Sequence, residues 1–352
     1  MSVNQRRVAL ITGGNSGIGF ATASKLVAGG FHVILASRNQ ATSAQACGRL
    51  RAANPNASVE SIPLDLASFA AVRQCAAAFQ AKGYPLHVLI NNAGGSIPGK
   101  HARLTADGFE LTLGTNHLGH FLLTHLLLDD LQRSAPARVI TVSSQLHIPG
   151  YAGGPPPDFD YDNLKGEKYY NAAIFYRNSK LANMWFTYEL QRRLAGTSVT
   201  SNAVCPGFVP AAIGDRRTAP IVRFLYQQIL ARMPFARSLE QASASYLIAA
   251  TDPRLEGVGG KFIVDGKARR SSDDSYDEHK ARRLWEMSEV WCGLKVSGVA
   301  LRVTSQPSIV NADRAAEEKG QRPDRNDQPQ PRPDEGRNPG EPAEGDCVID
   351  EA

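Results

Sequence analysis

The sequence predicts an α/β fold in which a doubly wound parallel sheet forms one domain over residues 1–294. Three observations predict it. Short apolar, β-branched runs alternate with longer helical patterns along the chain. A glycine-rich turn joins the first of these runs to the first helical pattern. No stretch with the composition of a linker interrupts the alternation before Leu294.

Each element follows from its own pattern. Gly29 and Gly30 are typical of a helix end and close the first helical pattern. Alternating strands and helices imply parallel strands joined by right-handed crossovers. The 153–157 stretch is rich in Gly and Pro and is interpreted as a surface loop. The predicted strands are Val8–Ile11, Val33–Leu35, Leu86–Ile90, Val139–Val142, Val199–Val204 and Lys261–Val264. The predicted helices are Ile18–Ala28, Phe69–Gln80, Asn171–Ala195 and Gln241–Ala250.

Composition excludes several classes of protein. The net charge of +5, without a Lys/Arg run, argues against nucleic-acid binding. The five cysteines form no CxxC pair, so neither a disulfide framework nor a metal site is expected. The longest apolar stretch, Leu118–Leu128, is broken by Gly and His and is too short for a membrane span. A strand predicted from Arg7 onward leaves no room for a signal peptide, and we expect a cytoplasmic protein.

The end of the chain differs in composition from the rest. No aromatic residue follows Trp291, and residues 311–352 hold 12 acidic and 6 basic side chains. This tail carries −6, which leaves +11 on residues 1–310 of the chain's net +5. Such a segment buries too little apolar surface to offset its ordering entropy, so disorder is expected over residues 295–352.

The glycine-rich turn indicates a dinucleotide site. Thr12–Gly19 reads TGGNSGIG and leads directly into a helical pattern. Glycines let the backbone approach a pyrophosphate, and a helix N-terminus offers free N–H groups and a positive dipole end. A plain strand–helix turn is the alternative interpretation. The residues predicted to bind the cofactor here are Gly13, Asn15, Ser16, Gly17, Ile18 and Gly19.

The end of the second strand favours NADP over NAD. An acidic residue there would bind the ribose 2′-hydroxyl of NAD. The sequence instead has Ser37 and Arg38, which can hydrogen-bond and pair with a 2′-phosphate. The alternative is an exposed arginine without a ligand. We therefore expect NADP(H) as the cofactor.

Tyr176 and Lys180 form a candidate catalytic pair. Their i, i+4 spacing in a helical pattern puts the phenol and the ammonium on one face. A neighbouring ammonium is expected to lower a phenol pKa that would otherwise be about 10. The same lysine can hydrogen-bond the nicotinamide ribose. An ordinary helix face is the alternative, since YxxxK is a common pattern.

Further polar residues accompany this pair. Ser143 and Ser144 end a predicted strand at the carboxyl edge, where ligands bind in open α/β sheets. A hydroxyl there can polarise a substrate carbonyl. Asn116 is a candidate to hold a proton-relay water, and a helix kink or a buried amide bonded to backbone is its alternative role.

In combination these residues resemble the short-chain dehydrogenase/reductase family, which has a Rossmann-type fold. The resemblance covers roughly residues 6–294. The motifs that carry it are TGxxxGxG at Thr12–Gly19, Asn91–Gly94, Asn116, Ser144, Tyr176 with Lys180, and Pro206–Gly207.

The resemblance implies a role for each matching residue. Ser144, rather than Ser143, would orient the carbonyl; Tyr176 would be the general acid/base; Lys180 would hold ribose; Asn116 would complete the relay. Further contacts to the cofactor are implied for Asp65, Leu66, Asn92, Ala93, Gly94, Pro206, Gly207 and Val209. The 208–212 stretch, FVPAA, departs from the family pattern by lacking a Thr or Ser that would contact the nicotinamide carboxamide.

The retinol dehydrogenase-like branch is the most similar, with some similarity to light-dependent protochlorophyllide reductases. Three stretches carry this: Asn163–Tyr170, Tyr176–Phe186 and Ala281–Glu286. The branch implies a small or lipophilic carbonyl or alcohol as substrate, and the family implies a possible homo-oligomer. Asp215–Arg237, mixed apolar and arginine-rich, would form a substrate lid or an amphipathic helix packed on the sheet.

Two other functions stay open at this point. One is a non-catalytic NADP-binding regulator that keeps the fold, and the other is a light-driven reductase of the protochlorophyllide type.

Overall fold

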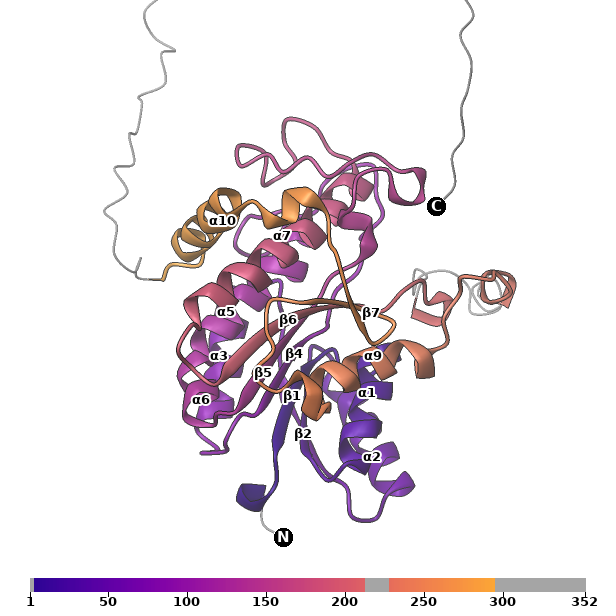
Figure 1. The fold of residues 1–352 in the computed structure, drawn as a ribbon, viewed down its shortest axis with the longest axis vertical. Helices are drawn as coiled ribbons and strands as arrows, with labels where there is room; N and C mark the ends of the chain where they lie inside the picture. Colours follow the sequence, from indigo (N-terminus) through magenta and orange to yellow (C-terminus); the bar gives the residue numbers. More distant parts are fainter. Residues whose placement is uncertain (1–2, 213–227, 295–352) are drawn as a thin grey trace, which may run out of the picture. The chain divides into compact units, whose positions relative to one another are not determined.

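An eight-stranded sheet forms the centre of the described residues, which in this computed structural model are 3–212 and 228–294. The strand order is β3-β2-β1-β4-β5-β6-β7-β8, and all neighbours are parallel except β7 and β8 (Figure 1). The strands are β1 Val8–Thr12, β2 His32–Ser37, β3 Ser58–Pro63, β4 Val88–Asn91, β5 Ala137–Val142, β6 Val199–Cys205, β7 Phe262–Val264 and β8 Lys267–Arg269. The predicted doubly wound parallel sheet is therefore confirmed.

The sheet departs from the sequence prediction at its two edges. β3 was not predicted, because it pairs only with β2 and its half-exposed sequence, SVESIP, carries no apolar run. β8 returns antiparallel to β7 through Asp265 and Gly266, whose φ angles are 49° and 72°. Two positive φ angles in an Asp-Gly pair define a tight hairpin turn of the type that matches strand twist. The fourth strand also begins at Val88 rather than Leu86.

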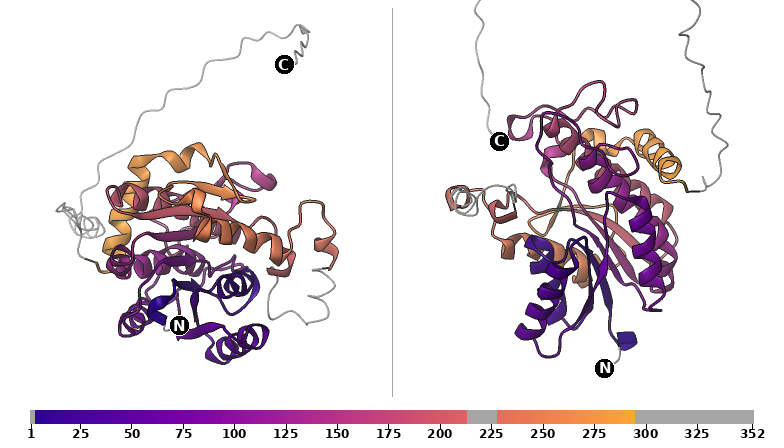
Figure 2. Two further views of the ribbon diagram at one scale, coloured as in Figure 1. Left: turned by 60° about the horizontal axis from the view of Figure 1, so that its bottom comes forward. Right: turned by 180° about the vertical axis from the view of Figure 1, so that it is seen from behind.

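Helices cover both faces of the sheet. One face carries α1 Gly17–Ala28, α2 Gln40–Ala53 and α9 Leu239–Thr251. The other carries α3 Phe69–Gln80, α5 Gly119–Leu126, α6 Leu128–Arg133 and α7 Ala172–Arg193, with α10 Glu278–Trp291 packed on α7. Figure 2 shows the same two layers from other sides. The predicted helices correspond to α1, α3, α7 and α9, whereas α2 and α10 were not among them.

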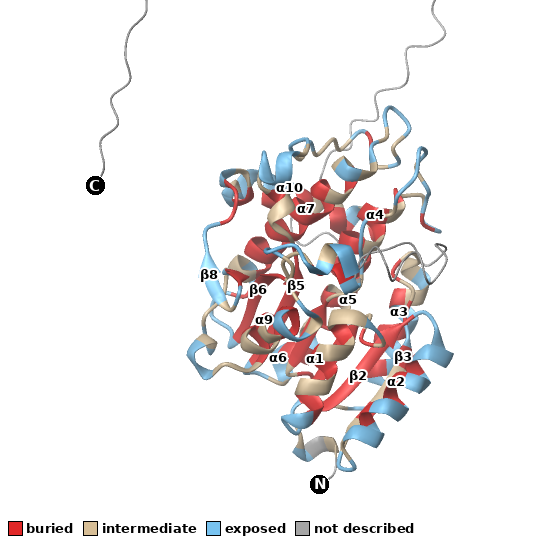
Figure 3. Cartoon of the chain, turned by 90° about the vertical axis from the view of Figure 1, so that its right-hand side faces the viewer, coloured by how far each residue is buried: buried red, intermediate tan, exposed pale blue. Residues whose placement is uncertain are grey.

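Two apolar cores hold the layers together. Alternate residues of β1 serve different cores: Val8 and Leu10 pack toward α3 and α5, whereas Ala9 and Ile11 pack toward α1 and α2. Figure 3 shows the strands and the inner helix faces buried and the outer faces of α2 exposed. Burial on both faces explains why the central strands read as unbroken apolar runs.

The strand order reverses beside β1, since the chain runs outward to β2 and β3 and then returns to β4 on the other side. A crevice forms at such a reversal, outside the carboxyl ends of the strands. In the described residues no helix combines the length and apolar character that crossing a bilayer requires. The predicted disordered tail, 295–352, lies outside the described residues.

Candidate functional site

Parallel pairing brings the separate motifs to one edge of the sheet. β1, β4, β5 and β6 run in the same direction and end at Thr12, Asn91, Val142 and Cys205. The glycine-rich turn, the segment from Asn92 to Gly94, the serine pair and Pro206–Gly207 each follow one of these ends. All of them therefore lie along the carboxyl edge, where the reversal beside β1 opens the crevice.

The glycine-rich turn has the backbone that a pyrophosphate site needs. Gly13 and Gly17 have φ angles of 65° and 55°, which residues with a side chain rarely adopt. A Cβ on Gly19 would lie 2.5 Å from the carbonyl oxygen of Gly13. Ser16 stands at the N-cap of α1 without a side-chain cap bond, so the first-turn N–H groups of α1 stay available. These features fit a dinucleotide phosphate, as predicted for Gly13, Ser16, Gly17, Ile18 and Gly19.

The side chain of Asn15 connects the glycine-rich turn to α2. Its Nδ2 donates to Oγ1 of Thr42 on α2 at 2.7 Å, which ties the tip of the loop to the neighbouring helix. One donor hydrogen of the amide is thus used, and Oδ1 of Asn15 accepts no hydrogen bond among the described contacts.

Thr12 joins the glycine-rich turn to the β4 segment. Its Oγ1 accepts hydrogen bonds of 2.8 Å from the N–H groups of Asn92 and Ala93, and Asn92 Nδ2 donates to the Thr12 carbonyl. With both lone pairs accepting, the Thr12 hydroxyl can donate to His120 Nε2, 2.8 Å away. Burial lowers the pKa of His120 to about 3, so the ring stays neutral and can accept this bond.

The end of β2 presents one free cation. Arg38 is exposed, and no partner is found for its guanidinium among the described residues. Ser37 is different, because its buried Oγ lies 2.5 Å from Ser43 Oγ, which itself donates to the Asn39 carbonyl. The Ser37 hydroxyl therefore donates its proton to Ser43, and the expected hydrogen bond from Ser37 to a 2′-phosphate is not supported. Arg38 alone carries the argument for a phosphate here.

Asp65 and Leu66 follow β3 at the same edge. One carboxylate oxygen of Asp65 accepts from the N–H of Ala67, which leaves the other oxygen unused among the described contacts. The Leu66 side chain belongs to the apolar core. Its backbone also lies close to α5, since a Cβ on Gly119 would lie 2.6 Å from the Leu66 carbonyl oxygen. Leu66 could therefore meet a cofactor only through its backbone, whereas the Asp65 carboxylate can still do so.

Tyr176 and Lys180 lie one turn apart on α7, with the ammonium nitrogen 5.4 Å from the centre of the phenol ring. Lys180 is buried, and its Nζ donates to the carbonyl of Val142 at 3.1 Å. Burial lowers the pKa of Lys180 to about 8 and raises the pKa of Tyr176 to about 12. In this state desolvation of the phenolate therefore sets the phenol pKa above its usual value, and the expected lowering by Lys180 stays a prediction.

The two serines after β5 have different roles. Ser143 is buried, and its hydroxyl donates to the main-chain carbonyl of Lys180 at 2.8 Å. Ser144 is partly exposed, and its Oγ accepts from the N–H of Leu146 at 3.2 Å. Among the described contacts the Ser144 hydroxyl donates to no acceptor. Ser144 is therefore the serine with a proton available for a substrate oxygen.

Asn116 lies in a π-helical turn, η2 Gly114–Leu118, that precedes α5. Its Oδ1 accepts from Gly95 N–H at 3.0 Å, and its Nδ2 donates to the carbonyl of Gly95 and to Ser179 Oγ. A Cβ on Gly94, whose φ is 142°, would lie 2.3 Å from Asn116 Oδ1. The amide thus fixes the loop after β4, and the main-chain carbonyl of Asn116, which lies 3.1 Å from His120 Nδ1, is a candidate to hold a relay water.

Pro206–Gly207 follows β6 on the far side of the crevice. Gly207 has a φ of 75°, and its N–H donates to Cys205 Sγ. Val209 is buried, so its side chain packs inside rather than toward a ligand. Arg237 N–H donates to the Phe208 carbonyl and its guanidinium pairs with Asp265. This pairing fixes where the chain re-enters the fold after the predicted lid.

The predicted lid, Asp215–Arg237, falls mainly outside the described residues, up to 227. In its described part Ile229 and Phe235 are 63% and 58% exposed, and Phe235 packs its ring on Phe208 at 5.4 Å between ring centres. The exposed Phe235 ring therefore lies next to the Pro206–Gly207 turn.

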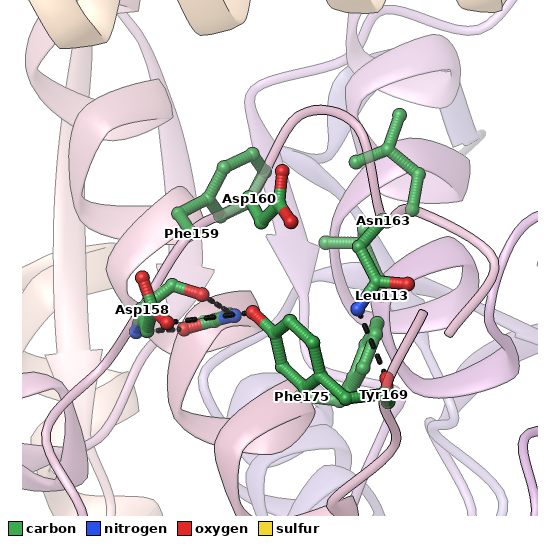
Figure 4. Close-up of a pocket in the computed structure, with 9 residues that line it drawn as sticks. Leu113, Asp158, Phe159, Asp160, Asn163, Tyr169 and Phe175 are labelled. Atoms are coloured by element: carbon green, nitrogen blue, oxygen red, sulfur yellow. Dashed lines mark hydrogen bonds between the residues drawn. The ribbon is translucent and has the colours of Figure 1, made fainter. Parts of the chain in front are cut away.

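The segment between Ser144 and α7 is tied down by residues of α7 itself. Arg177, buried without a carboxylate partner among the described residues, donates to the carbonyls of Leu146 and Tyr151. Asn178 exchanges two hydrogen bonds with the backbone of Asp158, and Asn163 Nδ2 donates to the Tyr169 carbonyl. Figure 4 shows Asp158, Asn163 and Tyr169 converging around a small hollow beside Phe175. The predicted surface loop at 153–157 belongs to this anchored segment.

Sequence reasoning missed three residues that organise the site: His120, His147 and Arg177. Each is buried and bonded to the backbone of a site segment. The only available signal was position, since His120 follows Asn116 by four residues, His147 follows Ser144 by three, and Arg177 follows Tyr176.

Comparison with known proteins gives consistent results. The family described as short chain dehydrogenase matches residues 7–156. Human retinol dehydrogenase 14 is 40% identical over 301 residues, covering 82% of this chain and 87% of that protein. Human polyprenol dehydrogenase is 40% identical over 290 residues, covering 80% and 84%. A solved structure of a variant actinorhodin polyketide ketoreductase with NADPH has a TM-score of 0.56 at 25% identity, covering 75% of this chain and 97% of that one.

Proposed function

The chain belongs to the short-chain dehydrogenase family, and on that premise we propose that it is an NADP(H)-dependent oxidoreductase that interconverts a carbonyl and an alcohol. We propose further that its substrate is small or lipophilic, of retinoid-like character. The observation that carries the proposal is the joining of the Ser144 turn to the helix of Tyr176. Ser143 bonds to Lys180 and Leu146 to Arg177, so the residues on either side of Ser144 are attached to α7 around Tyr176.

The residues of the crevice fit the cofactor. The positive-φ glycines and the uncapped start of α1 form a cradle that a Cβ would fill, and Arg38 offers an unpaired guanidinium for a 2′-phosphate. Lys180 and the Asn92–Gly94 segment would hold the nicotinamide half. Bound NADP(H) would supply or accept the hydride at the substrate carbon.

The chain's own residues handle the proton. A phenol with a pKa of about 12 is protonated at neutral pH, which is the form that must donate to a nascent alkoxide in carbonyl reduction. The free Ser144 hydroxyl can donate to the same oxygen and stabilise its growing charge. Lys180, held at the Val142 carbonyl, lies beside the ring to favour the phenolate that remains.

Two features support a lipophilic substrate. Ile229, Met233 and Phe235 are exposed, although apolar side chains usually avoid water, and Phe235 packs on Phe208 just after the Pro206–Gly207 turn. The relatives named for retinol and polyprenol have long apolar alcohols in their names. We also propose a cytoplasmic location, supported by the four described cysteines, which are all buried and free.

Oxidation of NADPH and of NADH with retinal, long-chain aldehydes and ketones, measured in complete darkness, tests the proposal. Turnover with NADPH supports it. Tight NADPH binding without turnover of any of these carbonyls would favour a non-catalytic regulator, and turnover that needs light would favour a light-driven reductase.

A further inference from the structure

His147 is a buried histidine whose two ring nitrogens are both bonded to backbone. Nδ1 lies 2.5 Å from the carbonyl oxygen of Ser144, and Nε2 lies 3.1 Å from the main-chain nitrogen of Ser272. A backbone N–H can only donate, so Nε2 must accept, and Nδ1 must carry the proton that is donated to Ser144. The structure therefore fixes one neutral tautomer, and burial, which lowers the pKa of His147, keeps the ring neutral.

The ring has little freedom to leave this position. Its side chain is fully buried, and its edge meets the face of Phe262 on β7, with ring centres 5.1 Å apart and an interplanar angle of 88°. The Ser144 carbonyl also accepts from the main-chain N–H of His147 at 3.1 Å. Both hydrogen bonds to the Ser144 carbonyl thus come from His147, one from its backbone and one from its ring.

Ser272 is itself held by a hydroxyl network. Ser271 Oγ contacts Tyr188 OH on α7 at 2.7 Å and Ser275 Oγ at 2.6 Å, and Ser275 donates back to the Ser272 carbonyl. The N–H of Ser272 is thereby placed relative to α7, the helix that carries Tyr176 and Lys180. A chain of contacts runs from α7 through Ser271, Ser272 and His147 to the backbone of Ser144.

Resting on the proposed function, we propose that His147 is a positioning residue for Ser144, and that the Ser272 N–H selects its working tautomer. Ser144 has its carbonyl fixed by His147 and its Oγ bonded to Leu146 N–H. The position of its hydroxyl oxygen is then set by the protein before a substrate arrives, which is the preorganisation that carbonyl activation requires. The segment after β8, which carries Ser272, then helps to position Ser144.

Ser272 offers a matched pair of variants. We call the hydrogen bonds that join Ser272, His147 and Ser144 the clamp. The Ser272 Oγ is buried and has no partner among the described residues, so Ser272→Ala removes no hydrogen bond of the clamp. The Ser272 φ of −64° suits proline, but the proline Cδ would replace the N–H and lie against His147 Nε2, so Ser272→Pro deletes the donor and also displaces the ring. The difference between these two variants therefore measures the loss of the contact between His147 and Ser272.

The tautomer of His147 is measured first, by a method that does not depend on catalytic activity. Proteins labelled with ¹⁵N-histidine should show a neutral Nδ1–H ring for His147, identified by its absence from His147→Leu. An Nε2–H ring would overturn the proposal.

Steady-state kinetics with NADPH and the best carbonyl substrate then test the role. Ser272→Ala should keep the wild-type kcat, and Ser272→Pro should lose on the order of 10-fold to 100-fold in kcat at an unchanged NADPH Kd. His147→Asn, which keeps an amide donor near the Nδ1 position, should retain more kcat than His147→Leu. In a Ser144→Ala background, Ser272→Pro should cause little further loss, because the clamp acts through Ser144.

Two results would overturn the role: wild-type kcat in Ser272→Pro, or an equal loss in the Ser144→Ala background. Because Ser272→Pro breaks the contact without changing the His147 side chain, this holds even where His147→Leu fails to fold. A wild-type protein that binds NADPH but reduces no carbonyl is a separate result, since it rejects the proposed function and with it any catalytic role of His147.

Discussion

The hydroxyl of Ser143 donates a 2.8 Å hydrogen bond to the main-chain carbonyl of Lys180, and it thereby attaches the end of β5 to the middle of α7. Ser143 therefore serves the fold, whereas for the adjacent Ser144 we propose a role in the reaction. We predict that Ser143→Ala lowers the free energy of unfolding by about 1 kcal/mol, while Ser144→Ala leaves stability nearly unchanged. Ser144→Ala should instead lower kcat on the order of 100-fold. Thermal melts and kinetics on both variants check this; a reversed pattern would assign the catalytic role to Ser143.

Tyr176→Phe removes only the phenolic oxygen from a helix whose packing is otherwise unchanged. NADPH affinity should stay within about twofold, whereas turnover should fall on the order of 10²-fold to 10⁴-fold, the usual contribution of a positioned acid. Fluorescence titration of NADPH and initial rates measure the two effects. An unchanged kcat would remove Tyr176 from the mechanism.

Arg38→Asp replaces the free guanidinium at the end of β2 with a carboxylate. The 2′-phosphate of NADPH would then be repelled, so the preference should shift toward NADH by at least about tenfold in kcat/KM. Arg282→Asp is the matched control, because Arg282 is also exposed but lies on α10. A shift of equal size in the control would mean that overall charge, rather than Arg38, sets the preference.

NADPH affinity should depend on pH through Lys180. Burial lowers the pKa of its ammonium to about 8 in the free protein, so the charged form is present below pH 8 and is lost above it. If the ammonium binds the cofactor, Kd should be flat below pH 8 and rise above it, approaching about tenfold per pH unit. Lys180→Met should bind more weakly with no such rise. A parallel rise in the variant would place the titrating group elsewhere.

Truncation after Leu294 should leave the melting temperature and NADPH binding nearly unchanged. The body of the chain closes its core through Trp285 and Cys292, which both precede the cut. Most of the removed residues, 311–352, are polar and acidic and offer little apolar surface that this core would lose. A fall in melting temperature of more than a few degrees would show that the tail packs on the catalytic body.

The sequence predicts the central fold well because strands that are buried on both faces appear in it as apolar runs. It misses β3, whose exposed edge position needs no such run, and β8, which depends on the Asp265–Gly266 turn. Residues such as Tyr176 and Lys180 can be found because their relationship is local in the chain. The contact of His147 with Ser272 spans 125 residues, and no pattern in the sequence connects them. Spacing also gives no measure of burial, which is why the phenol pKa was expected to fall rather than rise.

The π-helical turn at Gly114–Leu118 holds one more residue per turn than the α-helices that flank it. Loss of a single codon in this turn would let Leu111 to Leu126 wind as one regular helix. Asn116 would then swing by about 100° around the helix axis and release the loop that follows β4. A one-residue deletion in this turn should therefore leave the fold in place while it dissolves the arrangement of the site around Asn116.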